Sequence, residues 1–199
     1  MDFNLDWLLS TDYTQPKNFL VISSLLLAGI FLRYLALAWI YHEAVYKQLG
    51  DKMPFRRLHE QIKLPQVKTE IWYSFLGAII FAVAGAVMLI FWQKGLSQLY
   101  TQLTWWDTLW IPLSYFAALF IHETYYYWLH RWMHQPKVIR HFHHIHHNSL
   151  YTSSFTSFSF HPIEAGLQAI FLPVVVLVLP MHFFVLLALL LTMSITAVI

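Results

Sequence analysis

The sequence predicts an all-α protein whose helices form a polytopic bundle in a membrane. Only 11% of the 199 residues are charged and 58% are hydrophobic, whereas an average soluble domain has about 25% charged residues. The apolar residues also form runs that are too long for the core helices of a soluble protein. Length and composition together predict one membrane-embedded domain that covers residues 1–199.

Three apolar runs predict membrane-spanning helices. The first, residues 19–40, is interrupted only by Arg33. The second, residues 71–92, has no charged side chain and would be about 33 Å long as a helix, enough for a hydrocarbon core of about 30 Å. The third, residues 108–129, follows a belt of tryptophans. Residues 165–199 are also apolar, and Pro173 and Pro180 divide them, which predicts a C-terminal hydrophobic hairpin that is either re-entrant or spanning.

The basic residues orient these spans. Residues 41–70 contain six lysines and arginines, whereas residues 93–107 contain only Lys94. By the positive-inside rule, the first of these loops is cytoplasmic, and the chain returns to the cytoplasm after the third span. We therefore expect an integral membrane protein whose histidine-rich segment, residues 130–147, lies on the cytoplasmic side.

Several classes of function are excluded by what the sequence lacks. Without cysteine there are no disulfides, thiolate metal ligands or cysteine nucleophiles. The formal charge of +2 gives no sign of nucleic-acid binding, and no glycine-rich loop for a phosphate or dinucleotide is present. Any nicotinamide or flavin chemistry is therefore expected to come from another protein. The amino terminus is acidic and does not have the pattern of a signal peptide.

Histidines concentrate in one segment and predict a metal site. His130 and His134 are four residues apart, which places both imidazoles on one face of a helix. Pro136 is expected to end that helix, and the segment after it supplies three more candidate ligands: His143, His146 and His147. Adjacent histidines cannot share one helix face, but they can bind two different metals, or one metal from each side, which is a reason for the HxxHH spacing in a dinuclear site. Imidazole suits transition metals, and two such motifs together are hard to explain by packing alone.

Each of these features also has a structural interpretation. An isolated HxxxH pair is more often a surface or packing feature, and a histidine-rich tract can be a flexible metal-scavenging segment. Glu123 shares a helix face with His130 and could orient a ligand imidazole. His161 precedes Pro162 and Glu164, and we favour a simple helix start there. We assign no function to the remaining isolated histidines, His42, His59 and His182.

The motifs resemble those of the fatty acid hydroxylase and sterol desaturase superfamily, which are membrane non-haem di-iron enzymes. "ETYYYWLHRWMH", residues 123–134, contains the acidic residue, Tyr-Trp pair and HRxxH of the family. "RHFHHIHHNS", residues 140–149, contains its FHxxHH-Ser motif, and "SFSFHPIE", residues 157–164, is similar to its HP(L/I)(E/D) segment. The apolar residues that follow are most similar to the sterol C-5 desaturase branch.

The resemblance implies a function and a set of site residues. It implies a centre of two iron ions, held by His130, His134, His143, His146 and His147, with second-shell or structural roles for Glu123, His161 and Glu164. The implied reaction is O2-dependent hydroxylation or desaturation of a sterol or fatty acyl substrate from the bilayer, and the motifs do not separate these two outcomes. The implied electron donor is cytochrome b5 or a ferredoxin with its reductase.

One departure from the family pattern leads to a further expectation. Family members carry more histidines after the last hydrophobic hairpin, in an HxGxE-like element and a final HxxHH, which this sequence lacks. We therefore expect an amino-terminal portion that binds metal weakly and is inactive by itself.

The alternative, a non-enzymatic histidine-rich membrane metal-binding or transport protein, predicts ionisable residues inside several spans. The spans contain only Arg33 and the His122–Glu123 pair.

Overall fold

The computed structural model describes residues 10–44, 63–149 and 153–198, and its elements are almost all helices. The long helices are α2 (Pro16–Tyr41), α3 (Leu64–Gln93), α4 (Asp107–Met133) and α9 (Phe183–Val198). The short ones are α5 (Pro136–Val138), the π-helix η4 (Ile139–His143), α6 (His144–His147), the 3-10 helix η5 (Thr156–Phe158), α7 (Pro162–Ala169) and α8 (Phe171–Val178). Two short strands, β1 (Leu99–Tyr100) and β2 (Met181–His182), pair in parallel. The predicted all-α class is confirmed.

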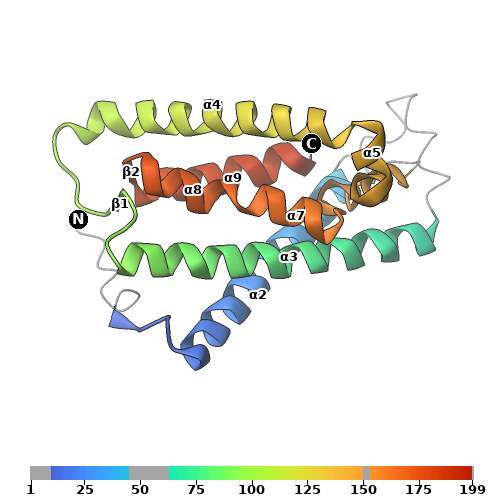
Figure 1. Cartoon of the computed structure of the whole chain (residues 1–199), viewed down its shortest axis with the longest axis horizontal. Helices are drawn as coiled ribbons and strands as arrows, with labels where there is room; N and C mark the ends of the chain where they lie inside the picture. Colours follow the sequence, from blue (N-terminus) through green and yellow to red (C-terminus); the bar gives the residue numbers. More distant parts are fainter. Residues whose placement is uncertain (1–9, 45–62, 150–152, 199) are drawn as a thin grey trace.

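The helices run along one long direction (Figure 1). The hairpin made by α7, α8 and α9 lies between α3 and α4 and contacts both of them, while α2 crosses α3 obliquely. The paired strands lie at one end of the bundle, and the short helices α5 and α6 lie at the other end. The predicted C-terminal hairpin is therefore present, and it joins the two long helices on either side of it.

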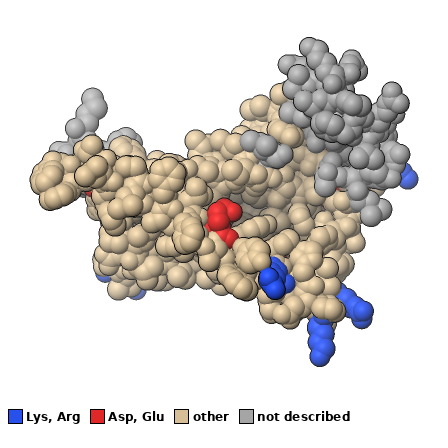
Figure 2. Space-filling model, turned by 90° about the horizontal axis from the view of Figure 1, so that it is seen from above, with Lys and Arg blue, Asp and Glu red and all other residues tan. Residues whose placement is uncertain are grey.

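Two helices in the described part of the chain are long and apolar enough to cross a membrane. They comprise Pro16–Ala44, with 29 residues, and Leu64–Gln93, with 30, and they contain the first two predicted spans. Helix α4 has 27 residues and covers the predicted third span, but its polar residues keep it outside this group. Figure 2 shows a largely uncharged face whose lysines and arginines lie mainly toward one end.

These findings are consistent with an all-α membrane protein. The count of three spans, the single domain and the cytoplasmic side of the histidines stay predictions. The basic positions between residues 45 and 62 and His59, which entered the orientation argument and the histidine survey, lie outside the described residues.

Small residues line the buried face of α3 and allow its neighbours to approach closely. The buried positions include Ser74, Gly77, Ala78, Ala82 and Ala86. A Cβ atom at Gly77 would lie 3.7 Å from the Cβ of Ala165 on α7, so the two helix backbones are close here. Close backbone approach through small residues is a common way to pack helices in membranes, where lipid competes for apolar side chains.

Glycine ends α3 at the turn toward the strands. Gly95 has a φ of 66°, a left-handed conformation that other residues rarely adopt. The backbone N–H of Leu96 donates to the carbonyl of Phe91 at 2.9 Å, and that of Gly95 donates to Trp92 at 3.0 Å. This hydrogen-bond pattern is the Schellman motif, and it satisfies the last carbonyls of the helix.

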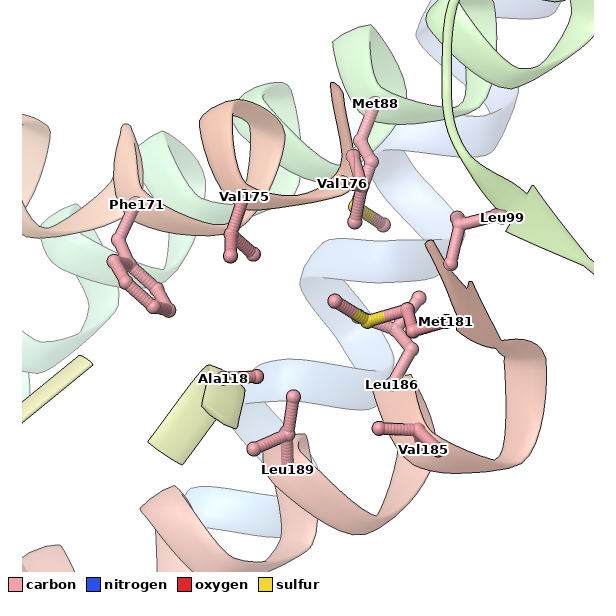
Figure 3. Packing of buried hydrophobic residues seen from close by; sticks show 10 residues of the cluster. All are labelled: Met88, Leu99, Ala118, Phe171, Val175, Val176, Met181, Val185, Leu186 and Leu189. Carbon is pink, nitrogen blue, oxygen red and sulfur yellow. The ribbon is translucent and has the colours of Figure 1, made fainter. Parts of the chain in front are cut away.

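The apolar core lies toward the strand end of the bundle (Figure 3). Its buried side chains come from α3, β1, α4, α8, β2 and α9: Met88, Leu99, Ala118, Phe171, Val175, Val176, Met181, Val185, Leu186 and Leu189. These contacts hold the hairpin between α3 and α4. They also fix the position of α4, whose other end carries the first histidine pair.

Polar side chains close the same end of the bundle. Asp107, the first residue of α4, accepts hydrogen bonds from Tyr100 Oη and from Thr104 Oγ1, the latter at 2.7 Å. His182 is buried, and its Nδ1 accepts from the backbone N–H of Phe184 at 3.1 Å, which caps the start of α9. The His182 Nε2 lies 3.1 Å from the carbonyl oxygen of Thr101. These bonds tie the hairpin tip to the turn before α4.

We expect Asp107→Asn to destabilise the fold in a pH-dependent way. The hydrogen bond from Tyr100, followed by those from Thr104, lowers the pKa of Asp107 below the usual value for an aspartate. The carboxylate therefore contributes stability above about pH 4, and this contribution is lost as pH falls through the folded pKa. Thermal unfolding of the detergent-solubilised protein should show a melting temperature a few degrees lower for the variant at pH 7, and a smaller gap near pH 3. A difference in melting temperature that is the same at both pH values would contradict this expectation.

Candidate metal centre

The last turn of α4 carries the first histidine pair. Helix α4 ends at Met133 with His134 as its C-cap, and Gln135 is extended before Pro136 begins α5. The predicted end of this helix before Pro136 is confirmed. Its physical reason is that proline disfavours the helical conformation of the residue before it. The Nε2 atoms of His130 and His134 lie 3.0 Å apart.

A π-helical turn presents the second pair. In η4 the backbone N–H of His144 donates to the carbonyl of Ile139, five residues earlier. Such turns hold one extra residue and often occur at functional sites. Here the turn ends at His143 and leads directly into α6, which carries His147, and the Nε2 atoms of these two histidines lie 3.1 Å apart. The sequence predicted the histidines of this pair but not the π-helical turn that presents them.

The two pairs face each other. The ring centroid of His143 lies 5.0 Å from that of His130 and 4.9 Å from that of His134, and the His134 and His147 centroids are also 4.9 Å apart. One nitrogen from each of His130, His134 and His143 lies within 4.8 Å of the other two. His146 is set slightly apart, with its centroid 5.8 Å from His143 and 5.7 Å from His147.

These nitrogens fit a metal ion. A metal bonds imidazole nitrogen at about 2.1 Å, so two nitrogens on one ion at ordinary bond angles lie about 3.0–3.4 Å apart. The separations within the two pairs, 3.0 and 3.1 Å, match this geometry. His146 lies beside the pairs, and its partly buried ring offers a further nitrogen donor. Four of the five predicted ligands are therefore brought together, and the fifth flanks them.

The surroundings of these histidines favour the neutral form that binds metals. His143 has no exposed surface, and burial, assisted by the neighbouring imidazoles, lowers the pKa of His143 to about 3. Burial is also the main cause that lowers the pKa of His146 and of His147. A neutral imidazole keeps a lone pair for a metal, so no proton has to leave these rings at neutral pH before a metal binds.

A buried carboxylate orients His143. Glu164 Oε2 lies 3.0 Å from His143 Nδ1, and Glu164 is only 1% exposed. Burial raises the pKa of Glu164 to about 8. When Nδ1–H donates to the carboxylate, the lone pair of Nε2 points toward the other histidines, an arrangement typical of metal-binding histidines.

The HP segment places this carboxylate. His161 is the N-cap of α7, and its Nδ1 accepts from the backbone N–H of Ile163 at 3.1 Å. Pro162 begins the helix and Glu164 lies in its first turn, as in the favoured structural interpretation. Glu164 therefore belongs to a helix start and also contacts a candidate ligand.

The sequence suggested that Glu123 orients a ligand imidazole, but in the structure its carboxylate contacts His122 instead. Its Oε1 lies 3.0 Å from His122 Nδ1, and its side chain is 66% exposed. Although Glu123 and His130 share a helix face, seven residues correspond to about 10 Å along the helix axis, too far for a hydrogen bond. Among the described residues, Glu164 occupies the position that was expected of Glu123.

A second buried carboxylate, Glu70 on α3, was not identified from the sequence. It accepts hydrogen bonds from Gln66, Ser153 and Thr156. The available sequence signal was a glutamate directly before an uncharged apolar run and four residues after a glutamine. Its partners at 153 and 156 lie more than 80 residues away, which local pattern cannot reveal.

Comparison with known proteins gives consistent results. A family model described as fatty acid hydroxylase matches residues 115–199, which include all five candidate ligands. The chain is 26% identical to lathosterol oxidase of Rattus norvegicus over 170 residues, which is 84% of this chain and 54% of that protein. It is 40% identical over 70 residues to Delta(7)-sterol 5(6)-desaturase ERG3 of Saccharomyces cerevisiae, covering 35% of this chain and 19% of that protein.

A third relative extends the same pattern. The chain is 32% identical over 177 residues to Delta(7)-sterol 5(6)-desaturase of Eremothecium gossypii, covering 84% of this chain and 48% of that protein. The chain thus spans about half the length, or less, of these curated relatives. No solved structure matches it significantly.

Proposed function

This chain belongs to the fatty acid hydroxylase and sterol desaturase superfamily, and we propose that it is part of a di-iron, O2-dependent oxidoreductase that acts on a sterol. The observation that carries the proposal is the meeting of two histidine pairs whose nitrogens are spaced for metal binding. The names of the relatives, lathosterol oxidase and Delta(7)-sterol 5(6)-desaturase, support a sterol as the substrate and desaturation as the reaction.

Five imidazoles would hold the iron: His130, His134, His143, His146 and His147. A di-iron centre supplies the oxidising power that removal of hydrogen from an unactivated C–H bond requires, which no side chain can supply. The protein's own contribution is to keep His143 neutral by burial and to orient its ring through Glu164.

The surroundings of the cluster suit a lipid substrate and a protein electron donor. Large apolar side chains on α4 are exposed, including Phe116, Phe120 and Trp128 at 64%, 73% and 60%, and they offer an apolar path from the bilayer. Arg131, Lys137 and Arg140 are exposed beside the cluster. Such positive groups favour an acidic donor, and we propose cytochrome b5 or a ferredoxin with its reductase at the cytoplasmic side.

The test is to express the complete open reading frame that encodes this chain in cells whose own sterol C-5 desaturase has been deleted. Sterols and fatty acyl chains would be profiled by mass spectrometry and compared with a His143→Ala, His147→Ala variant. We expect a new double bond in the sterol with the unaltered protein and none with the variant. New hydroxylated or desaturated acyl chains with unchanged sterols would show that the sterol assignment is wrong, and unchanged lipids with unaltered iron content would contradict the enzyme assignment.

A further inference from the structure

A buried carboxylate outside the histidine cluster holds a segment that contacts it. Glu70 lies in the second turn of α3 and is 1% exposed. Its Oε1 accepts from Gln66 Nε2 at 2.8 Å and from Thr156 Oγ1 at 2.9 Å, and its Oε2 accepts from Ser153 Oγ at 2.7 Å. A carboxylate is unfavourable away from water unless its oxygens are hydrogen-bonded. Three donors meet that requirement here.

The same two hydroxyls organise the turn that contains them. Thr156 Oγ1 accepts from the backbone N–H of Ser153 at 2.8 Å, and Ser153 Oγ accepts from that of Phe155 at 3.1 Å. Each hydroxyl therefore donates to Glu70 and accepts from the turn backbone. Glu70 thereby attaches this turn to α3 across sequence separations of 83 and 86 residues.

The turn leads directly to a candidate ligand. Ser159 and Phe160 follow η5 and are both buried. The Phe160 ring centroid lies 5.3 Å from that of His146, and the Ser159 backbone also lies against the His146 imidazole. His146 is the candidate ligand set apart from the two pairs, so the packing of this segment sets where its ring lies.

We propose that Glu70 is a positioning residue for His146, acting through Ser153, Thr156 and the segment that ends at Phe160. The proposal rests on the proposed metal centre and extends it to a helix that carries no ligand. Glu70 fixes the beginning of the segment 153–164, and Glu164, which contacts His143, lies at its end. One continuous stretch of chain thus holds two candidate ligands, and its two ends are set by two different buried carboxylates.

A control is needed because Glu70 could stabilise the bundle without acting on His146. Asp107 provides it, since it is also buried and accepts several hydrogen bonds, from Tyr100 and Thr104. It lies on the first turn of α4, whereas the histidine pair lies on the last. Loss of either carboxylate should lower the melting temperature, but only loss of Glu70 should alter metal binding.

The experiment titrates the purified, detergent-solubilised protein, expressed from the complete open reading frame, with Co2+ and records its visible absorption spectrum. We expect Glu70→Ala to weaken Co2+ binding about tenfold, the lower end of the range for loss of an outer hydrogen-bond partner, and to change the spectrum. Glu70→Gln keeps one acceptor and should have a smaller effect. Asp107→Asn should change neither. In a His146→Ala background, Glu70→Ala should not weaken Co2+ binding further, because the proposed effect of Glu70 acts through His146 and the two substitutions are then not additive.

The outcomes separate this inference from the proposed function. No Co2+ uptake by the unaltered protein would refute the metal centre, and the inference with it. Normal uptake together with unchanged binding in Glu70→Ala would overturn only the positioning role. Additive effects of Glu70→Ala and His146→Ala would do the same. If Glu70→Ala does not fold, Glu70→Gln becomes the test variant. Unchanged Co2+ binding by Glu70→Gln, together with a lowered melting temperature, would then overturn the positioning role.

Discussion

His143→Ala is expected to remove most metal binding from this chain. His143 links the two pairs, since its Nε2 lies 3.1 Å from that of His147 and its centroid lies within 5.0 Å of those of His130 and His134. The other rings cannot replace it, because His143 alone among the five is fully buried and held by a carboxylate. We expect Co2+ affinity to fall by more than about 100-fold, beyond the range for loss of an outer hydrogen-bond partner.

His144→Ala is the matched control for this variant. His144 is the next residue along the chain and is exposed, so the substitution changes the same segment without touching the cluster. Its Co2+ affinity and spectrum should equal those of the unaltered protein. If His144→Ala weakened binding as much as His143→Ala, the metal would be bound by a loose histidine tract and not by the two pairs.

His143→Ala should also destabilise the metal-free protein. The substitution removes a buried ring and leaves Glu164, 1% exposed, without its imidazole partner. An unsatisfied buried polar group costs about 1–3 kcal/mol, which a melting curve in the absence of metal would detect. Comparing affinities at a temperature where both proteins are folded separates this loss of stability from the loss of a ligand.

The sequence predicted helix positions well and helix ends less well. The run 71–92 became α3, Leu64–Gln93, which begins seven residues earlier than the apolar stretch. Hydropathy marks the part that suits lipid, whereas the helix continues to residues that can begin or cap it, here Pro65 and Gly95. For the same reason α4 continues beyond residue 129 to Met133 and presents His130 on a helix.

The contacts around the site were only partly predictable. The spacing of His130 and His134 fixes their proximity locally, because an interval of four residues places side chains on one helix face. The choice between Glu123 and Glu164 as the partner of a ligand imidazole depends on how α7 packs, which local pattern does not encode. Two further features also depend on tertiary packing and could not be predicted from local pattern. They are the parallel pairing of Leu99–Tyr100 with Met181–His182 and the hydrogen bonds from Ser153 and Thr156 to Glu70.

Glu164→Ala is expected to weaken Co2+ binding about 10–100-fold, as loss of an outer hydrogen-bond partner typically does. Without the carboxylate, the Nδ1 of His143 loses its acceptor in a fully buried site, and the ring is no longer fixed with Nε2 toward the other histidines. Glu164→Gln should lie between this variant and the unaltered protein, because an amide oxygen still accepts the hydrogen bond but carries no charge. Glu123→Gln should leave affinity unchanged, since Glu123 contacts His122.

The pH dependence of binding should show that the charge of Glu164 matters. Burial raises the pKa of this carboxyl to about 8 in the metal-free protein, so it is largely protonated at pH 7. A cation on the other side of the His143 ring favours the carboxylate, so metal binding releases a proton from Glu164. Below pH 8, Co2+ affinity should therefore rise more steeply with pH in the unaltered protein than in Glu164→Gln, which has no such proton to release. Parallel pH profiles for the two proteins would mean that Glu164 only fills space beside the ring.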